Sequence, residues 1–283
     1  MRLVDSHCHL QSDRFRRDVD LVIGGAKLAG VERILVPGWD LASCAAGLAL
    51  VDDFPWLDPA VGVHPHEAAG VDDAGWASIE RLAVDERVVA IGETGLDFDR
   101  VFSPVEAQLT NLRRNLALAV RLGKPAILHC RSAEGRRDAQ DTLLVELRQA
   151  GLGSAATRAA FGSRPPAVIH SYSGPRDFAE AVLAMGLAIS FSGLVFRDGE
   201  EASADVARIV PRGRALVETD SPFLSPPGAP RKRNEPEWVR LTAAWLAEAR
   251  GVDEDELGKD LVAAYDAIFR RSRARLTRPE RSG

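Results

Sequence analysis

The sequence predicts an α/β protein whose eight parallel strands close into a (β/α)8 TIM barrel. Short β-rich runs alternate with longer amphipathic stretches along the 283 residues, and eight such units follow one another. Strands that alternate with helices pair in parallel, because each helix returns the chain to the same end of the sheet. The length is slightly above the roughly 250 residues of one such barrel, so we expect a single domain over residues 1–283.

The predicted strands are short and rich in Val, Ile and Leu. They begin at Leu3, Arg33, Leu57, Val88, Pro125, Ala167, Leu187 and Arg214. Stretches of helical length lie between them, among them residues 105–122 and 177–185. Residues 151–166 read as a long loop or an insertion, residues 225–236 as a Pro-rich loop over the barrel mouth, and the tail from about residue 273 as a frayed end. An open doubly wound sheet is the alternative, but its Gly-rich turn after the first strand is missing.

Composition and charge limit the class of protein. The formal net charge of -5 argues against a generally basic surface for nucleic acid. It does not exclude a nuclease, because bound divalent cations add positive charge that this sum omits. The cysteines Cys8, Cys44 and Cys130 have no metal-finger spacing and suit reduced thiols in the cytoplasm. With no signal peptide and no apolar run of ~20 residues, we expect no membrane association, and nothing indicates an obligate protein partner.

The first predicted strand ends in a His-x-His pair. His7 and His9 are two residues apart, and alternate side chains of a strand point to the same side. Both imidazoles can therefore reach one metal ion, whereas Cys8 between them faces the opposite way. Two histidines also occur near strand ends without any function, so this pair alone leaves both interpretations open.

Four further predicted strands each end in a His, Glu or Asp after an apolar run. These residues are Glu93, His129, His170 and Asp220. Such groups are costly to bury without a partner, and the reactive groups of barrels lie at the carboxyl ends of the strands. Each one alone fits a satisfied core histidine or a structural ion pair about equally well. Their recurrence at corresponding strand ends does not follow from core packing.

Together these residues predict one metal-dependent hydrolytic site. The predicted ligands are His7, His9, Glu93, His129, His170 and Asp220. Nitrogen and oxygen donors without thiolate suit two divalent ions such as zinc or manganese, and magnesium less naturally. Two ions ~3.5–4 Å apart can make a hydroxide at neutral pH and clamp both oxygens of a phosphodiester. We expect Glu93 and Asp220 to be catalytic as well, with Asp220 accepting a proton from the attacking water.

Seven short motifs strengthen this hypothesis. In chain order they are DSHCHL, GVHPHE, GETGLDF, LHCR, HSYSG, ETDSP and RNEP, spanning residues 5–236. In this order they resemble the TatD family of deoxyribonucleases. The resemblance implies an amidohydrolase-like TIM barrel with a dinuclear centre and 3′ to 5′ removal of nucleotides from DNA with a divalent ion such as magnesium. It also implies that His7, His9 and Asp220 bind one ion, that His129 and His170 bind the other, and that Glu93 bridges them.

Further residues near the predicted mouth are candidates for contact with substrate. His64 and His66 flank Pro65, and the resemblance implies that they meet the substrate phosphate. Arg131 can hold a phosphate through two hydrogen bonds, or form an ion pair with Glu93 or Asp97. Asp97 itself can orient a ligand histidine or cap the following helix.

Three other features bear on the substrate. Residues 171–174 can offer backbone N–H groups to an anion, and residues 231–233 form a basic cluster that is either a solvated face or a phosphate-steering patch. Gln11 and Asp99 depart from the family's usual residues. These departures remove no predicted ligand and concern substrate preference.

Three functions therefore compete. The first is a deoxyribonuclease in which a metal-bound hydroxide attacks phosphorus, with DNA as substrate. The second keeps the hydrolytic site but acts on a small cyclic amide, a lactone or an aminoacyl-tRNA ester, because one barrel supports many chemistries. The third is a barrel that binds metal or nucleic acid without turnover, which the complete ligand set argues against.

Overall fold

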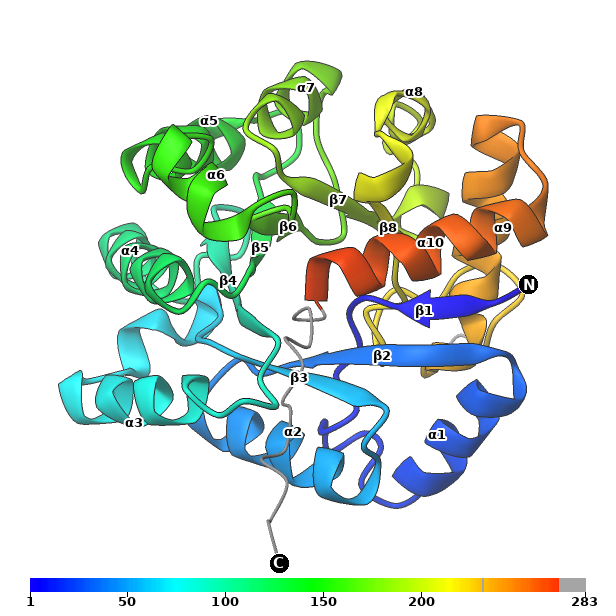
Figure 1. Ribbon diagram of the computed structural model, residues 1–283, viewed down its shortest axis with the longest axis horizontal. Coiled ribbons are helices and arrows are strands. Elements are labelled where there is room, and N and C mark those ends of the chain that lie inside the picture. The colour runs from blue at the N-terminus through cyan, green and yellow to red at the C-terminus, as the bar shows by residue number, and fades with distance from the viewer. Residues whose placement is uncertain (231, 270–283) are drawn as a thin grey trace, which may run out of the picture.

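The chain forms an eight-stranded parallel sheet that is ringed by helices. A computed structural model describes residues 1–230 and 232–269 (Figure 1). The strands hydrogen-bond in the order of the sequence, from β1 to β8. They are β1 Leu3–Asp5, β2 Val31–Pro37, β3 Leu57–Val61, β4 Ala90–Asp97, β5 Ala126–Arg131, β6 Ala167–Ile169, β7 Ala188–Phe191 and β8 Ala215–Val217. The predicted (β/α)8 barrel is confirmed.

Helices connect the strands and cover the outside of the barrel. They are α1 Val19–Leu28, α2 Leu41–Asp53, α3 Asp73–Ala83, α4 Val105–Leu122, α5 Asp138–Gln149, α6 Ala155–Phe161, α7 Arg176–Ala184, α8 Ser203–Ile209, α9 Val239–Arg250 and α10 Glu254–Phe269, with short 3-10 turns η1 Pro65–Gly70, η2 Gly193–Phe196, η3 Arg212–Arg214 and η4 Pro236–Trp238. Over the described residues, none of these helices has the length and apolar character needed to cross a membrane.

The sequence-based elements agree with these helices except in one segment. Residues 105–122 form α4 as predicted, and the helix predicted at 177–185 is α7, one residue earlier. The predicted long loop over 151–166 is wrong, because it contains α6. The hydroxyl of Ser154 accepts the N–H of Thr157 and so caps this short helix, which the Gly-rich composition concealed. The frayed tail predicted from about residue 273 lies outside the described residues.

The barrel closes where its last strand meets its first. The N–H of Ser6 donates to the carbonyl of Val217 at 3.1 Å. Beyond the strands proper, the backbone N–H of Asp220 donates to the carbonyl of His7 at 2.9 Å, and the backbone N–H of His9 donates to the carbonyl of Ser221 at 2.8 Å. The segments that carry three predicted ligands are therefore the segments that close the barrel.

A buried carboxyl group holds this seam together. Asp5 is fully buried, and its Oδ1 accepts the N–H groups of Thr219 at 2.9 Å and of His7 at 3.2 Å. Its Oδ2 lies 2.5 Å from the hydroxyl of Thr219. Burial raises the pKa of Asp5 to about 8, against the lowering effect of these hydrogen bonds. The neutral carboxyl can therefore donate to the Thr219 hydroxyl while accepting the two backbone N–H groups.

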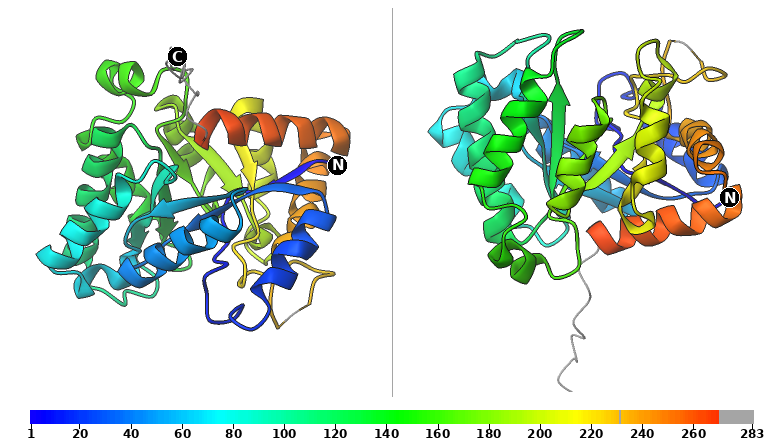
Figure 2. Two further views of the ribbon diagram at one scale, coloured as in Figure 1. Left: turned by 60° about the horizontal axis from the view of Figure 1, so that its bottom comes forward. Right: turned by 90° about the horizontal axis from the view of Figure 1, so that it is seen from above.

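The opposite end of the barrel is built for packing. Helix α10 crosses the amino-terminal ends of the strands (Figure 2). A Cβ atom on Gly258 would lie 2.5 Å from the carbonyl oxygen of Arg2, so the helix can approach β1 this closely only with glycine there. Within the same end, Tyr265 donates its hydroxyl to Asp58 at 2.9 Å, and Asp58 is paired with Arg33. This end stabilises the fold and leaves the carboxyl ends of the strands for chemistry.

Replacing Asp5 by Asn should change how stability depends on pH. An amide keeps the seam, because its oxygen accepts the two N–H groups and its nitrogen donates to Thr219. In the wild type, a carboxyl group whose pKa rises from 3.8 when unfolded to about 8 when folded contributes stability that is complete at low pH. That contribution declines as the pH rises and is lost by about pH 8.

The measurement is the melting temperature of both proteins, with chelator present, between about pH 5 and pH 9. The wild-type value minus the Asp5→Asn value should fall up to about pH 8 and then stay level. A difference that is constant over this range would show that Asp5 is ionised in the fold.

Candidate metal centre

One buried carboxylate lies at the middle of the predicted ligands. Glu93 is inside β4 rather than at its end, because the strand continues to Asp97. Its backbone sits where two strands approach closely, since a Cβ atom on Gly62 would come 2.5 Å from the Cα of Gly92. The Glu93 side chain is 3% exposed and points into the mouth of the barrel. Glycine at both of these positions lets β3 and β4 place this carboxylate.

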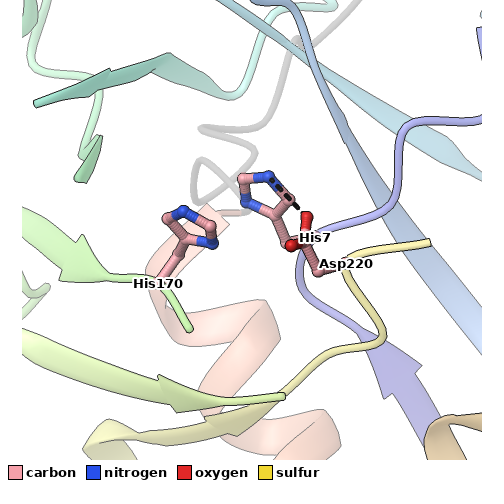
Figure 3. Close-up of side chains that lie close together, drawn as sticks. All are labelled: His7, His170 and Asp220. Atoms are coloured by element: carbon pink, nitrogen blue, oxygen red, sulfur yellow. Dashed lines mark ion pairs between the residues drawn. The ribbon is translucent and has the colours of Figure 1, made fainter. Parts of the chain in front are cut away.

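The Oε2 atom of Glu93 faces the His-x-His pair. It lies 3.1 Å from Nε2 of His7 and 3.6 Å from Nε2 of His9. These two nitrogens are 3.2 Å apart, and Oδ1 of Asp220 lies 3.5 Å from the nitrogen of His9 and 3.8 Å from that of His7. Figure 3 shows Asp220 directed at the His7 ring. Two imidazoles and two carboxylates thus converge on one point.

The backbone of Asp220 adopts an unusual conformation to reach this point. Its φ angle is +55°, a left-handed value that Asp tolerates better than most residues. Holding a non-glycine residue there costs on the order of 1–3 kcal/mol and persists only where the surroundings enforce it. The enforcing contact is the hydrogen bond from its N–H to the carbonyl of His7. The seam of the barrel therefore aims the Asp220 carboxylate.

The Oε1 atom of Glu93 faces a second group of imidazoles. It lies 2.8 Å from Nε2 of His170, 3.2 Å from Nδ1 of His129 and 3.2 Å from Nε2 of His64. The rings of His170 and His7 stack with centroids 3.9 Å apart, so the two groups adjoin (Figure 3). Each oxygen of one carboxylate thus has its own set of nitrogen neighbours.

The remaining nitrogens of three histidines are tied to fixed acceptors. Nδ1 of His9 donates to the carbonyl of Pro37 at 3.3 Å. Nε2 of His129 donates to Asp97 at 3.2 Å, and Nδ1 of His170 donates to Glu218 at 3.1 Å. A proton held on the outer nitrogen leaves the inner nitrogen with a free lone pair, which is the usual arrangement of metal-binding histidines.

His7 and His64 differ from these three. Nδ1 of His7 is buried and has no hydrogen-bond partner among the described residues. Nδ1 of His64 accepts the N–H of His66 at 3.1 Å, so Nε2 carries the proton of the neutral ring and donates to Glu93. Burial lowers the pKa of His64 to about 4, which keeps this ring neutral at physiological pH. In this arrangement His64 steadies the carboxylate.

The charges of the cluster are strongly coupled. Burial alone would raise the pKa of Glu93, but its interactions with the surrounding imidazoles, above all with His170, outweigh burial and hold the pKa well below its ordinary value. Burial would likewise lower the pKa of His170, but the charges of Glu93 and Glu218 raise it well above the ordinary value. Without a metal ion, the carboxylate is therefore compensated by imidazolium groups. A divalent cation can take their place.

Glu218 is a residue of this site that the sequence-based prediction missed. It is fully buried, and its Oε1 accepts the N–H of Ser171 at 2.6 Å as well as the His170 proton. We predicted that residues 171–174 offer backbone N–H groups to an anion. The N–H of Ser171 is not available for this, because it already donates to Glu218, and α7 begins only at Arg176. The available signal was a second carboxylate two residues before Asp220 in the same apolar run.

Asp97 takes one of the two roles that were left open for it, the contact with a ligand histidine, and does not cap the following helix α4. Its Oδ2 accepts from His129 and, at 2.7 Å, from Nε2 of His66. Its Oδ1 accepts the N–H groups of Asp99 and Arg100, which caps the turn after β4 rather than a helix. This carboxylate therefore orients an imidazole and shapes the loop at the same time.

The predicted substrate contacts all line one cavity of about 1140 Å³ over the cluster. His64 lies inside the cluster itself, and His66 sits beside Asp97. Arg131 forms an ion pair with Asp99 at 2.7 Å, and not with Glu93 or Asp97. Its side chain is 46% exposed towards the cavity, so a role in phosphate binding stays a prediction.

The basic cluster at residues 231–233 is only partly described. Arg231 lies outside the described residues. Arg233 is held by Asp18 at 2.8 Å and Glu235 at 2.6 Å, so its charge is compensated within the fold. This pairing favours a structural role for Arg233 over phosphate steering.

The barrel and the cluster at its mouth define the class: a metal-dependent hydrolase. The family model described as TatD related DNase matches residues 4–270, and the chain belongs to that family.

Individual relatives agree with this assignment. The chain is 34% identical to the 3′-5′ ssDNA/RNA exonuclease TatD of Erwinia billingiae (strain Eb661), covering 95% of this chain and 99% of that protein. It is 30% identical to the uncharacterized metal-dependent hydrolase YabD of Bacillus subtilis (strain 168), with the same coverage. The crystal structure of YJJV, a TatD homolog from Escherichia coli K12, superposes with a TM-score of 0.82 at 29% identity and covers 95% of this chain and 98% of that chain.

Metal affinity should rise with pH. Burial lowers the pKa values of His9, His129 and His170, but carboxylate neighbours outweigh it and raise all three above the ordinary value. A bound ion must displace these protons, so each one displaced adds about a factor of ten in apparent affinity per pH unit. Calorimetric titration at about pH 6 and pH 8, in buffers of different ionisation enthalpy, measures both affinity and protons released. Equal affinity at both pH values without proton release would contradict this charge state.

Replacing Glu218 by Gln should weaken metal binding without unfolding the barrel. The amide oxygen can take the place of Oε1 and accept from both Ser171 and His170, so the fold is kept. The amide carries no negative charge, however, so His170 loses the carboxylate that makes its inner nitrogen a stronger metal ligand. Loss of such an outer partner typically costs about 10–100-fold in metal affinity, and we expect a loss in this range.

The matched control is Glu200→Gln. Glu200 is a partly buried carboxylate that lines the same cavity, but it contacts Ser173 rather than an imidazole. Calorimetric titration of both variants with zinc or manganese makes the comparison. Wild-type affinity in Glu218→Gln would show that the charge of Glu218 does not strengthen His170 as a metal ligand.

Proposed function

We propose that this protein is a 3′ to 5′ exonuclease that hydrolyses phosphodiester bonds of DNA at a centre of two divalent ions. The observation that carries the proposal is the two-sided surrounding of Glu93. One of its oxygens faces His7 and His9, and the other faces His129 and His170. A carboxylate placed in this way is suited to bridge two ions.

The residues divide into two ligand groups about this carboxylate. His7, His9 and Asp220 would hold one ion, and His129 and His170 would hold the other. The donor set of imidazole and carboxylate without thiolate fits a divalent ion of the zinc or manganese type and also accommodates magnesium. When bound, two such ions supply a lowered pKa for water and positive charge against the phosphate.

Asp220 is the residue proposed to take the proton from the attacking water. Burial would raise its pKa, but the hydrogen bond from His9 and the charge of His7 lower it, so the carboxylate is ionised. Its side chain is 15% exposed and lines the cavity, where substrate and water can reach it. His64 would act through Glu93, by donating its Nε2 proton to Oε1 and holding the carboxylate in place.

The cavity favours a polymer over a small cyclic substrate. Its volume of about 1140 Å³ exceeds the range of roughly 300–1,000 Å³ typical of pockets for small ligands. Four arginines line it, namely Arg100, Arg131, Arg136 and Arg197. The names of the relatives, which act on single-stranded DNA and RNA, support the same substrate class. The three cysteines are free and buried, which fits the reducing cytoplasm as its compartment.

The test is digestion of single-stranded DNA labelled at one end, with magnesium, manganese or zinc. We expect stepwise shortening from the 3′ end in the wild type and its loss on chelation. His129→Ala and Glu93→Gln should each lower kcat/KM by more than the roughly 10–100-fold caused by outer-shell changes, because they remove direct ligands.

The matched control for Glu93→Gln is Glu146→Gln. Glu146 is equally buried but pairs with Arg113 on the outside of the barrel, and its substitution should leave the nuclease rate unchanged. Circular dichroism checks that the variants fold. Hydrolysis of a lactone or cyclic amide by a metal-loaded enzyme that leaves DNA intact would refute the nuclease, and wild-type turnover in His129→Ala would refute the site.

A further inference from the structure

Two aromatic side chains stand beside one predicted ligand at the barrel mouth. Trp39 follows β2 and Phe223 follows β8, and both rings meet His9 edge-on with centroids 5.2 Å and 6.2 Å from it. Both line the cavity that contains the candidate metal centre. We call Trp39 and Phe223 the aromatic wall.

Core packing does not account for Phe223. Its side chain is 51% exposed. A large apolar group gains little from the hydrophobic effect at this level of exposure, so burial does not explain its position. The chain around it is nevertheless held firmly. Its N–H donates to the carbonyl of Asp220 at 2.9 Å, and Arg14 donates to the carbonyl of Pro222 at 3.1 Å.

The other side of the same loop is fixed as well. The carbonyl of Leu224 packs so closely on Gly193 that a Cβ atom there would lie 1.9 Å from it. Phe223 is thus a rigidly supported aromatic ring that faces the cavity. A ring held in this way can bind a flat partner without a large loss of conformational entropy.

The opposite wall of the cavity carries three arginines among carboxylates such as Asp99 and Glu134. Arg100 follows β4, Arg131 ends β5 and Arg136 follows β5, which lies across the barrel from β1. Arg131 and Arg136 have carboxylate partners, but the guanidinium of Arg100 forms no ion pair with any residue in the described part of the chain. The candidate metal centre lies between this wall and the aromatic wall.

From this asymmetry we propose that the aromatic wall, with Phe223 as its exposed face, stacks the nucleobase at the 3′ end of a single-stranded substrate. The inference rests on the proposed nuclease function and names the part of the substrate that is recognised. Stacking needs a base that is not paired, so the same wall selects single strands over duplex. Every base has a flat face, so the wall tolerates any sequence.

The charge distribution gives the direction of the strand. With the terminal base on the aromatic wall beside His9, the phosphate on the 5′ side of the terminal nucleotide lies over the candidate metal centre. The remaining backbone then continues towards Arg100 and the other arginines. A lactone or cyclic amide would leave both walls unused.

The test uses a short DNA strand with the fluorescent base 2-aminopurine at its 3′ end and a non-hydrolysable methylene phosphonate as its last linkage, so that the metal-loaded protein binds the strand without cleaving it. Stacking quenches 2-aminopurine, so binding to the wild type should quench it. Phe223→Ala should weaken binding about tenfold, within the range typical of one base–aromatic stack, and abolish the quenching. Phe223→Trp should restore both.

A strand with an abasic 3′ end provides the second arm. The wild type should bind it about as weakly as Phe223→Ala binds the normal strand, and Phe223→Ala should bind both strands alike. The matched control is Phe102→Ala, because Phe102 is also exposed, at 67%, and lies beside His66 without lining the cavity. It should bind and quench like the wild type.

The outcomes separate this inference from the proposed function. Wild-type quenching and affinity in Phe223→Ala, equal losses in Phe102→Ala, or no binding by the wild type would each overturn the stacking site. Base-dependent binding and quenching by a protein that cleaves no phosphodiester when loaded with metal would uphold the stacking site and refute the nuclease.

Discussion

The architecture of the mouth depends on one buried charge, the carboxylate of Glu93. A carboxylate inside a barrel is tolerated only when opposite charges or hydrogen-bond donors surround it. Here the surrounding groups are imidazoles, one on β5 and the others just after β1, β3 and β6. Each oxygen of the carboxylate has its own set of them. The same surroundings that make burial possible also form a cation site, because imidazolium protons and metal ions compensate the same charge. Stability without metal and affinity for metal are therefore two aspects of one interaction.

Closing the barrel and building the site are likewise one structural event. Asp5 joins β1 to Thr219, and the next hydrogen bond along the seam sets the left-handed conformation of Asp220. His7 and His9 lie on one side of the seam and Asp220 on the other. Any opening of the barrel between β8 and β1 would thus separate residues that we propose as ligands of one ion. We infer that the neutral Asp5 carboxyl protects the geometry of the site as well as the fold.

The sequence predicted the elements of the fold and the residues of the cluster, but not the contacts that orient them. Alternating apolar runs define strands locally. The alternation of side chains along an extended chain also predicted that His7 and His9 share a side, which they do although β1 itself ends at Asp5. In contrast, the partner of His170 is Glu218, 48 residues away, and that of Arg131 is Asp99, on a neighbouring strand's loop. An apolar run with a carboxylate indicates that a partner exists without identifying it. Side-chain partners across strands depend on barrel register, which no local pattern encodes.

The balance of charge at the mouth explains how an acidic protein can act on a polyanion. Arg131 and Arg233 are largely compensated by carboxylates, so the mouth offers little of the uniform basic surface on which non-specific nucleic-acid binding depends. Attraction must then come from the divalent ions proposed to bind at Glu93 and from Arg100, and selectivity from contacts that do not involve charge. An exposed, rigidly held Phe223 beside His9 provides such a contact. A site of this kind recognises the unpaired end of a strand, since only there are a free base face and a phosphate close enough to be bound together.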